Sequence, residues 1–267
     1  MREDQRETLP IYQAVISGST DLAPEYARLI RRKHRAYLNQ SQKFSEMQQD
    51  TDIAEWLEDF QLWNQENCEL ICLNENQRRD LNLVLQKQYA LLQWEQGSGK
   101  TLAGIAVGLY RMQRQHVYCT WVVSSAISIS NNWDGVLVNY DLPYIFVERL
   151  RDLERIRQGD FVLITTNVLV KYKRQIKHWM RTHGYKVDLV LDESDEITNP
   201  SSARTKAVLS CFRRCRAKLL TTGTSTRNNI VEFAPQLELL YNNSFNMISW
   251  VPYVYSTERN GDMTTKS

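Results

Sequence analysis

The sequence predicts an α/β fold in which helices cover both faces of a parallel sheet. From Tyr89 onward, short and nearly continuous apolar runs alternate with helix-like amphipathic segments. Strands of a parallel sheet are buried on both faces and read as such runs, and each connection between them needs a crossover, usually a helix. A glycine-containing turn also follows the first run and opens a helix-like segment, at the sheet edge where such folds bind ligands.

Each expected strand is four to eight residues long, which is typical of buried strands. The expected strands are Tyr89–Trp94, Val117–Ser124, Tyr144–Val147, Phe161–Thr165, Val187–Leu191 and Ala217–Thr221. The expected helices between and after them are Lys100–Gln113, Asn131–Tyr140, Asn167–Thr182, Ser202–Arg214 and Asn229–Tyr241.

The chain divides into three parts by composition. Residues 1–72 are rich in Gln, Glu, Arg and Asp and are predicted to form a mostly helical appendage, with an apolar stripe at Ile53, Trp56, Leu57, Phe60 and Trp63. Residues 73–245 hold the strand–helix alternation. Residues 246–267 are polar and are expected to be a tail or the start of a linker.

Composition excludes several classes of protein. Apolar residues make up 42% of the chain and charged residues 24%, which is typical of a folded globular protein and not of a disordered one. No apolar run approaches the roughly 18 residues of a membrane span, and the polar N-terminus does not resemble a secretory signal. Five cysteines, an odd number, indicate reduced thiols, so we expect a cytoplasmic protein without membrane partners. The net charge of +2 gives no global attraction to nucleic acid, so such binding requires local basic patches.

The segment Gly97-Ser-Gly-Lys-Thr101 follows the first expected strand and opens the first expected helix. Glycines let the backbone curl so that its N–H groups face a phosphate, and the helix N-terminus adds partial positive charge. Lys100 is then expected to reach the β- and γ-phosphates, and the Thr101 hydroxyl to bind Mg²⁺. The full phosphate-loop pattern has glycine where this chain has Trp94.

A carboxylate partner for this loop follows another buried strand. Asp192-Glu-Ser-Asp195 comes directly after Val187–Leu191. Asp192 is expected to hold Mg²⁺ through its water shell, and Glu193 to orient or deprotonate the attacking water. Together the two segments predict an enzyme that hydrolyses ATP with Mg²⁺.

The order of further motifs resembles the first RecA-like lobe of the Swi/Snf-type helicase-like ATPases of helicase superfamily two. The resemblance covers about residues 74–242 and rests on the phosphate loop, the segment from Trp121 to Asn132-Trp133, the acidic motif and Thr222-Gly-Thr-Ser-Thr-Arg-Asn228. It implies a P-loop NTPase fold, ATP and Mg²⁺ as cofactors, and movement along double-stranded DNA. It also implies a second RecA-like lobe, in cis or in trans, so we expect the chain alone to be nearly inactive.

The resemblance assigns roles to individual positions. It implies that Gln77 reads the adenine, that Gly97, Ser98, Gly99, Lys100 and Thr101 bind the nucleotide, and that Lys100 and Glu193 are catalytic. It implies that Thr101 and Asp192 serve the metal, and that Thr222, Gly223 and Thr224 couple the nucleotide to the DNA. It implies that DNA is contacted by Ser124, Asn132, Trp133 and Thr166, and the basic run adds Lys171, Lys173, Arg174 and Lys177.

The chain departs from the family pattern at Asp195, which replaces a histidine, at Ser225, which replaces a proline, and at Thr198, which replaces a lysine. Asp195 leans toward the D-E-A-D branch of RNA helicases. Two alternatives therefore stay open: an RNA-stimulated ATPase of that branch, and a scaffold that binds nucleotide without turnover.

Overall fold

A six-stranded parallel sheet forms the centre of the molecule, in the strand order β3-β8-β7-β4-β6-β5. The structure is a computed structural model that describes residues 42–223, 230–241, 255–257 and 263–265. The strands are β3 (Tyr89–Gln93), β4 (Cys119–Ser124), β5 (Tyr144–Phe146), β6 (Phe161–Thr165), β7 (Val187–Leu191) and β8 (Ala217–Thr222). The predicted fold class is confirmed.

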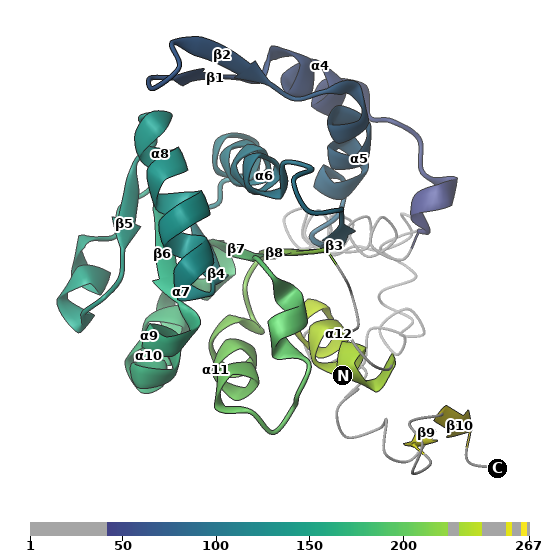
Figure 1. Ribbon diagram of the computed structural model, residues 1–267, viewed down its shortest axis with the longest axis vertical. Coiled ribbons are helices and arrows are strands. Elements are labelled where there is room, and N and C mark those ends of the chain that lie inside the picture. Colours follow the sequence, from purple (N-terminus) through teal and green to yellow (C-terminus); the bar gives the residue numbers. More distant parts are fainter. Residues whose placement is uncertain (1–41, 224–229, 242–254, 258–262, 266–267) are drawn as a thin grey trace, which may run out of the picture.

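Helices cover both faces of this sheet (Figure 1). One face carries α5, α6 and α8, and the other carries α9 to α12. The helices are α4 (Thr51–Asp59), α5 (Glu75–Leu85), α6 (Lys100–Arg114), α7 (Ala126–Ser128), α8 (Gly135–Asn139), α9 (Thr166–Lys171), α10 (Lys173–His183), α11 (Ala203–Phe212) and α12 (Ala234–Leu240). Shorter helical turns are η1 (Phe44–Glu46), η2 (Ile129–Asp134), η3 (Leu150–Arg155), η4 (Gly184–Lys186), η5 (Ser194–Ile197) and η6 (Ile230–Phe233).

Alternate residues of each central strand supply two separate hydrophobic clusters. In β4, Trp121 and Val123 pack with α9 to α12, whereas Val122 packs with α6 and η2 on the opposite face. Every residue of β4 is buried, which explains the continuous apolar run in the sequence.

A buried ion pair joins α6 to the sheet. Arg111 Nη1 lies 2.7 Å from Asp188 Oδ1 in β7, and both side chains are fully buried. This pair links residues 77 positions apart and was not predicted from the sequence.

The segment after β4 becomes helical five residues earlier than expected. Ser125 accepts a hydrogen bond from the backbone N–H of Ser128 and so caps α7, and the chain then continues through a π-helical turn, η2, into α8. The expected helix 167–182 is instead divided at Tyr172 into α9 and α10.

Residues 51–72 differ from the expected helical appendage. The helix α4 ends at Asp59, and an antiparallel hairpin follows, with β1 (Gln61–Asn64) paired to β2 (Glu69–Cys72). Trp63 therefore lies on a strand, where it is half exposed opposite Leu70. Ile53, Leu57 and Leu62 belong to the same hydrophobic cluster as the sheet, so this segment packs as part of the domain.

A second hairpin pairs β9 (Tyr255–Thr257) with β10 (Met263–Thr265), within the part predicted to be a tail or linker. The predictions for residues 1–41 and for Thr224 and Ser225 lie outside the described residues. Among the described helices, none is long and apolar enough to cross a membrane.

Candidate nucleotide site and nucleic-acid surface

The phosphate loop connects β3 to α6 through two glycines in left-handed conformations. Gly97 has φ +80° and Gly99 has φ +85°, a region that side chains strongly disfavour. Gly99 is constrained further because a Cβ atom there would lie 2.6 Å from Nε2 of Gln77. Gly99 is also the residue before the first turn of α6, so the loop directs the N–H groups of that turn toward the carboxyl edge of the sheet.

Lys100 is held across this loop by the loop's own carbonyls. Its Nζ atom donates to the carbonyl oxygens of Trp94, at 3.0 Å, and Glu95, at 2.8 Å. Trp94, which stands where the family has glycine, is fixed in turn by a 3.1 Å hydrogen bond from its indole to Asp80 in α5. The ammonium group is thus kept over the loop, where phosphate oxygens can replace the two carbonyls as its acceptors.

Gln77 connects α5 to the phosphate loop. Its Nε2 donates to the carbonyl oxygen of Ser98 at 2.9 Å, and its Oε1 accepts from the backbone N–H of Asn74. The second reciprocal bond of this capping box runs from the N–H of Gln77 to the Asn74 side chain. One amide hydrogen of Gln77 is left to contact an adenine base, and that role stays a prediction.

Asp192 follows β7 and is almost fully enclosed by hydrogen-bond donors. Its Oδ1 accepts from the Thr221 hydroxyl at 2.8 Å and from the N–H of Glu193 at 3.1 Å. Its Oδ2 accepts from the Ser128 hydroxyl and from the Trp133 indole, each at 3.0 Å. Donors from η2, α7 and β8 therefore orient a single carboxylate that is 7% exposed.

Asp192 was predicted from the sequence as a site residue, but the three side chains that donate hydrogen bonds to it were not predicted in this role. Thr221 was visible as a hydroxyl at the end of an apolar run. Ser128 and Trp133 could not be assigned, because only the early start of the helix at Ala126 turns them toward β7.

Glu193 lies next in the chain in a strained backbone conformation. Its φ is +52° and its ψ is +49°, a left-handed geometry that costs a residue with a side chain about 1–3 kcal/mol. Burial raises the pKa of its carboxyl group, the Ser125 hydroxyl opposes that change, and the negative charge of Asp192 reinforces it. A carboxylate with a raised pKa is a stronger base, as activation of a water molecule requires.

The two acidic residues and the phosphate loop lie at the same edge of the sheet. The loop follows β3 and the acidic pair follows β7, and β8 alone separates these two parallel strands. At about 4.8 Å per strand, the two strands are roughly 10 Å apart.

The residues present fit a magnesium ion that is held partly through water. Asp192 supplies the anionic oxygen that Mg²⁺ or its bound water prefers, but its four acceptor positions all receive hydrogen bonds here, so one of these donors would have to turn away for either contact. Thr101 opens α6 beside Lys100, and its hydroxyl makes no hydrogen bond within the part of the chain that the structure describes.

The third motif is linked directly to the acidic loop. The hydroxyl of Thr222, the last residue of β8, donates to Asp195 Oδ1 at 3.1 Å. Asp195 thus takes part in the contact between the acidic motif and the proposed coupling motif. Gly223 follows at the surface, and Thr224 lies outside the described residues.

The residues expected to contact DNA fall into two groups. Ser124, Trp133 and Thr166 are 1%, 0% and 4% exposed, because α7, η2 and α9 begin directly after the strands and cover them. In this structure their side chains are not available to DNA, which differs from the expectation. Asn132 is exposed, as are Lys171 and Arg174, while Lys173 and Lys177 are partly exposed.

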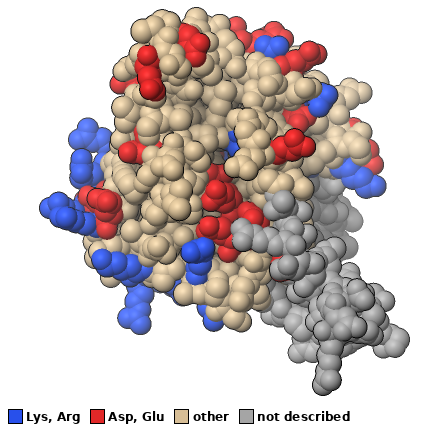
Figure 2. Space-filling model, in the orientation of Figure 1, with Lys and Arg blue, Asp and Glu red and all other residues tan. Residues whose placement is uncertain are grey.

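Charge is unevenly distributed over the face seen in Figure 2. Acidic side chains gather near the middle and along the upper edge of this face, and most of the basic ones stand at its left and lower left margin.

A parallel sheet with a glycine-rich phosphate loop after one strand and a carboxylate pair after another defines a P-loop NTPase lobe of the RecA-like type. The SNF2-related domain model matches residues 48–264. The chain therefore belongs to the SNF2-related domain family, a helicase-like group of superfamily two, and the family resemblance in the sequence is confirmed.

Curated relatives agree with this assignment. The chain is 29% identical over 171 residues to the chromatin-remodeling ATPase INO80 of Arabidopsis thaliana and 28% identical over 164 residues to that of Homo sapiens. Each alignment covers 57% of this chain, and the chain spans about a tenth of the length of these relatives.

Solved structures support the fold. The Sulfolobus solfataricus SWI2/SNF2 ATPase core in complex with dsDNA matches with a TM-score of 0.52 and 22% identity, covering 64% of this chain and 36% of that one. The UvsW helicase from bacteriophage T4 matches with a TM-score of 0.54 and 14% identity, covering 72% of this chain and 67% of that one.

Proposed function

We propose that this chain is the ATP-binding lobe of a DNA-dependent ATPase that moves along double-stranded DNA. One observation carries the proposal: the loop Gly97–Thr101 and the pair Asp192–Glu193 lie at the same edge of one sheet, with a single strand between them. The relatives named as chromatin-remodeling ATPases, and the similar core in complex with dsDNA, support ATP as the nucleotide and DNA as the partner.

Each residue then has a defined task. The N–H groups at the start of α6 and the ammonium group of Lys100 bind phosphate oxygens, and Lys100 gives up its bonds to Trp94 and Glu95 to do so. Magnesium, when bound, neutralises charge on the phosphates, and Thr101 and Asp192 are the residues that would hold it. Glu193 accepts a proton from the attacking water, for which its raised pKa suits it.

We further propose that turnover requires a second RecA-like lobe. In related phosphoryl-transfer enzymes, an arginine that reaches the γ-phosphate from outside the phosphate loop increases the rate by about 10³–10⁵. The purified chain should therefore bind ATP but hydrolyse it near the background rate. A steady-state ATPase assay with and without duplex DNA tests this, and strong DNA-stimulated turnover by the chain alone would contradict it.

DNA binding is assigned to four basic residues of α9 and α10 that are exposed or partly exposed, namely Lys171, Lys173, Arg174 and Lys177. Reversing the charges of Lys171 and Arg174 should weaken binding of every duplex sequence. It should also reduce the salt dependence of binding, because a protein that contacts fewer phosphates releases fewer counterions from the DNA. Unchanged duplex binding would remove these residues from the DNA surface. Stronger binding of single-stranded RNA than of duplex DNA by the parent chain would instead favour an RNA-stimulated ATPase.

A further inference from the structure

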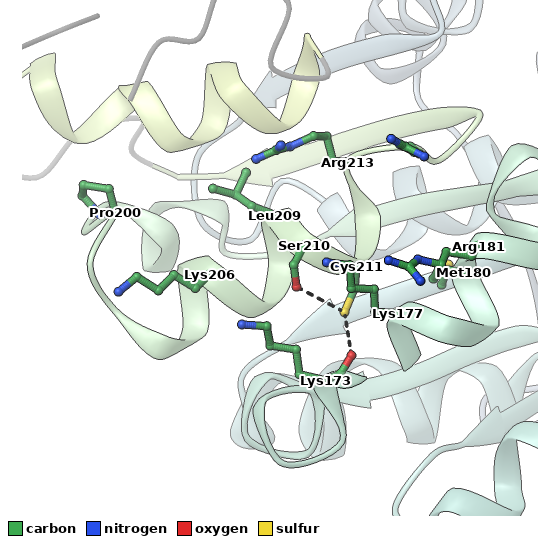
Figure 3. Close-up of a pocket in the computed structure, with 11 residues that line it drawn as sticks. Lys173, Lys177, Met180, Arg181, Pro200, Lys206, Leu209, Ser210, Cys211 and Arg213 are labelled. Carbon is green, nitrogen blue, oxygen red and sulfur yellow. Dashed lines mark hydrogen bonds between the residues drawn. The ribbon is translucent and has the colours of Figure 1, made fainter. Parts of the chain in front are cut away.

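A basic hollow lies between α10 and α11, away from the phosphate loop. Its volume is about 490 Å³. Figure 3 shows Ser210 and Cys211 of α11 beside Lys173 and Lys177 of α10, with Lys206 and Arg213 farther out. The Cys211 thiol donates to the carbonyl oxygen of Lys173 at 3.6 Å, which ties the two walls together. Six basic residues contribute to the lining: Lys173, Lys177, Arg181, Lys206, Arg213 and Arg214.

Among the described residues, one ion pair neutralises part of the charge of this hollow. It joins Arg213 to Glu238 at 3.7 Å. Within residues 42–223 and 230–241, no ion pair involves the other five basic side chains. Like charges gathered around one hollow repel one another and lower the stability of the folded state.

Arg213 can offer only part of its guanidinium group to an anion in the hollow. Its Nε atom is buried and has no hydrogen-bond partner among the described residues, whereas the side chain as a whole is 36% exposed. The accessible part of the guanidinium, and not the buried Nε, is therefore the group that an anion could contact.

We propose that this hollow binds a compact anion that carries several phosphate groups. Arginine forks and lysine ammonium groups together match phosphate oxygens, and their approach from opposite walls suits an anion with phosphates on more than one side. Lys173 and Lys177 are shared with the proposed DNA surface, whereas Arg181, Lys206, Arg213 and Arg214 belong to the hollow alone. The site is separate from the nucleotide site, because none of its lining residues belongs to the phosphate loop or the acidic motif.

Inorganic tripolyphosphate is a suitable probe, measured by calorimetric titration and by the shift in thermal unfolding of the full chain. Because the phosphate loop also attracts this anion, binding is compared in the parent chain and in Lys100→Ala. We expect Lys100→Ala to retain binding at the hollow, and Lys177→Gln with Lys206→Gln to weaken it by about tenfold or more. Orthophosphate should bind much more weakly than tripolyphosphate.

The control variant is Arg114→Gln with Arg157→Gln, which removes the same charge from exposed positions outside the hollow. It should bind tripolyphosphate like the parent chain. The hollow variant should unfold no earlier than the parent without the anion, since it removes repulsion, and should lose the stabilisation that the anion provides. Equal weakening in both double variants would overturn the proposal, as would binding that disappears in Lys100→Ala. If tripolyphosphate fails to bind while duplex DNA binding depends on Lys177 and Lys206, the hollow is part of a nucleic-acid surface instead.

Discussion

The contact between α6 and Trp133 leads to a quantitative prediction about Gly104. A Cβ atom at Gly104 would lie 2.7 Å from Cη2 of the Trp133 indole, a separation that forces atoms to move. The indole is fully buried, and its N–H is bound to Asp192, so it has little room to yield. Gly104→Ala should therefore destabilise the domain, even though alanine favours a helix by about 1 kcal/mol relative to glycine.

Two opposing terms set the size of this effect. Overpacking a filled core costs about 1–3 kcal/mol, so the net loss in the free energy of unfolding is up to about 2 kcal/mol. Trp133→Phe should cost more, because it removes a hydrogen bond to a charged acceptor that is worth about 1.5–3 kcal/mol. The smaller phenyl ring also lacks the indole atoms that the new Cβ would meet. The double variant should therefore be more stable than the sum of the single effects predicts, by about 1 kcal/mol.

Urea unfolding of the parent, both single variants and the double variant measures this coupling. Gly108→Ala is the matched control, because it lies on the same helix and its Cβ would meet Phe161, at 2.8 Å, rather than Trp133. Trp133→Phe should not rescue Gly108→Ala. Additive effects for Gly104→Ala and Trp133→Phe would refute the packing contact on which the prediction rests.

Two further predictions concern buried charges. Arg111→Met should lower the free energy of unfolding by about 3–5 kcal/mol, because it leaves Asp188 buried without its cation, and adding Asp188→Leu should recover most of that loss in urea unfolding. Burial already raises the pKa of Asp188, and loss of the positive charge of Arg111 should raise it further. The free energy of unfolding of Arg111→Met should therefore increase as the pH falls, and a decrease would contradict this reasoning. Burial lowers the pKa of Lys218 from 10.5 to about 7. Above pH 7 Lys218 therefore keeps its proton in the unfolded chain but loses it in the folded one, so the free energy of unfolding should rise with pH. Lys218→Met should reduce this pH dependence of the free energy of unfolding between about pH 7 and 8.5, a range chosen because ordinary thiols ionise above it. An unchanged pH dependence in unfolding experiments would contradict the lowered pKa of Lys218.

The central sheet was predictable because its strands are buried on both faces. β6 and β7 begin and end where the apolar runs do, and each of the other four strands differs from its apolar run by one or two residues at one end only. The glycines and Lys100 were likewise predictable, since their chemistry depends on local sequence. The charged residues Asp188 and Lys218 were visible within apolar runs. Their distant partners, Arg111 for Asp188 and the Leu239 carbonyl for Lys218, were not, because they come from elements far away in the sequence.

The errors arose where tertiary packing or capping decided the structure. Phe60 and Trp63 fit a helical stripe with Ile53, but the chain leaves the helix at Asp59 and pairs as a hairpin. The serines after β4 precede the expected start of the next helix at Asn131, yet Ser125 caps a helix that begins at Ala126. That early helix buries Trp133 and turns it toward Asp192, which is why a residue expected at the DNA surface lies behind the nucleotide site.

Calorimetric titration of ATP with Mg²⁺ tests the proposed nucleotide site most directly. Lys100 would contact phosphate in the ground state, whereas Glu193 would act on the attacking water. Lys100→Ala should therefore abolish binding, while Glu193→Gln and the exposed control Lys43→Ala should bind ATP like the parent chain. Parent-like ATP binding by Lys100→Ala, or loss of binding in Glu193→Gln alone, would contradict the assignment of this site.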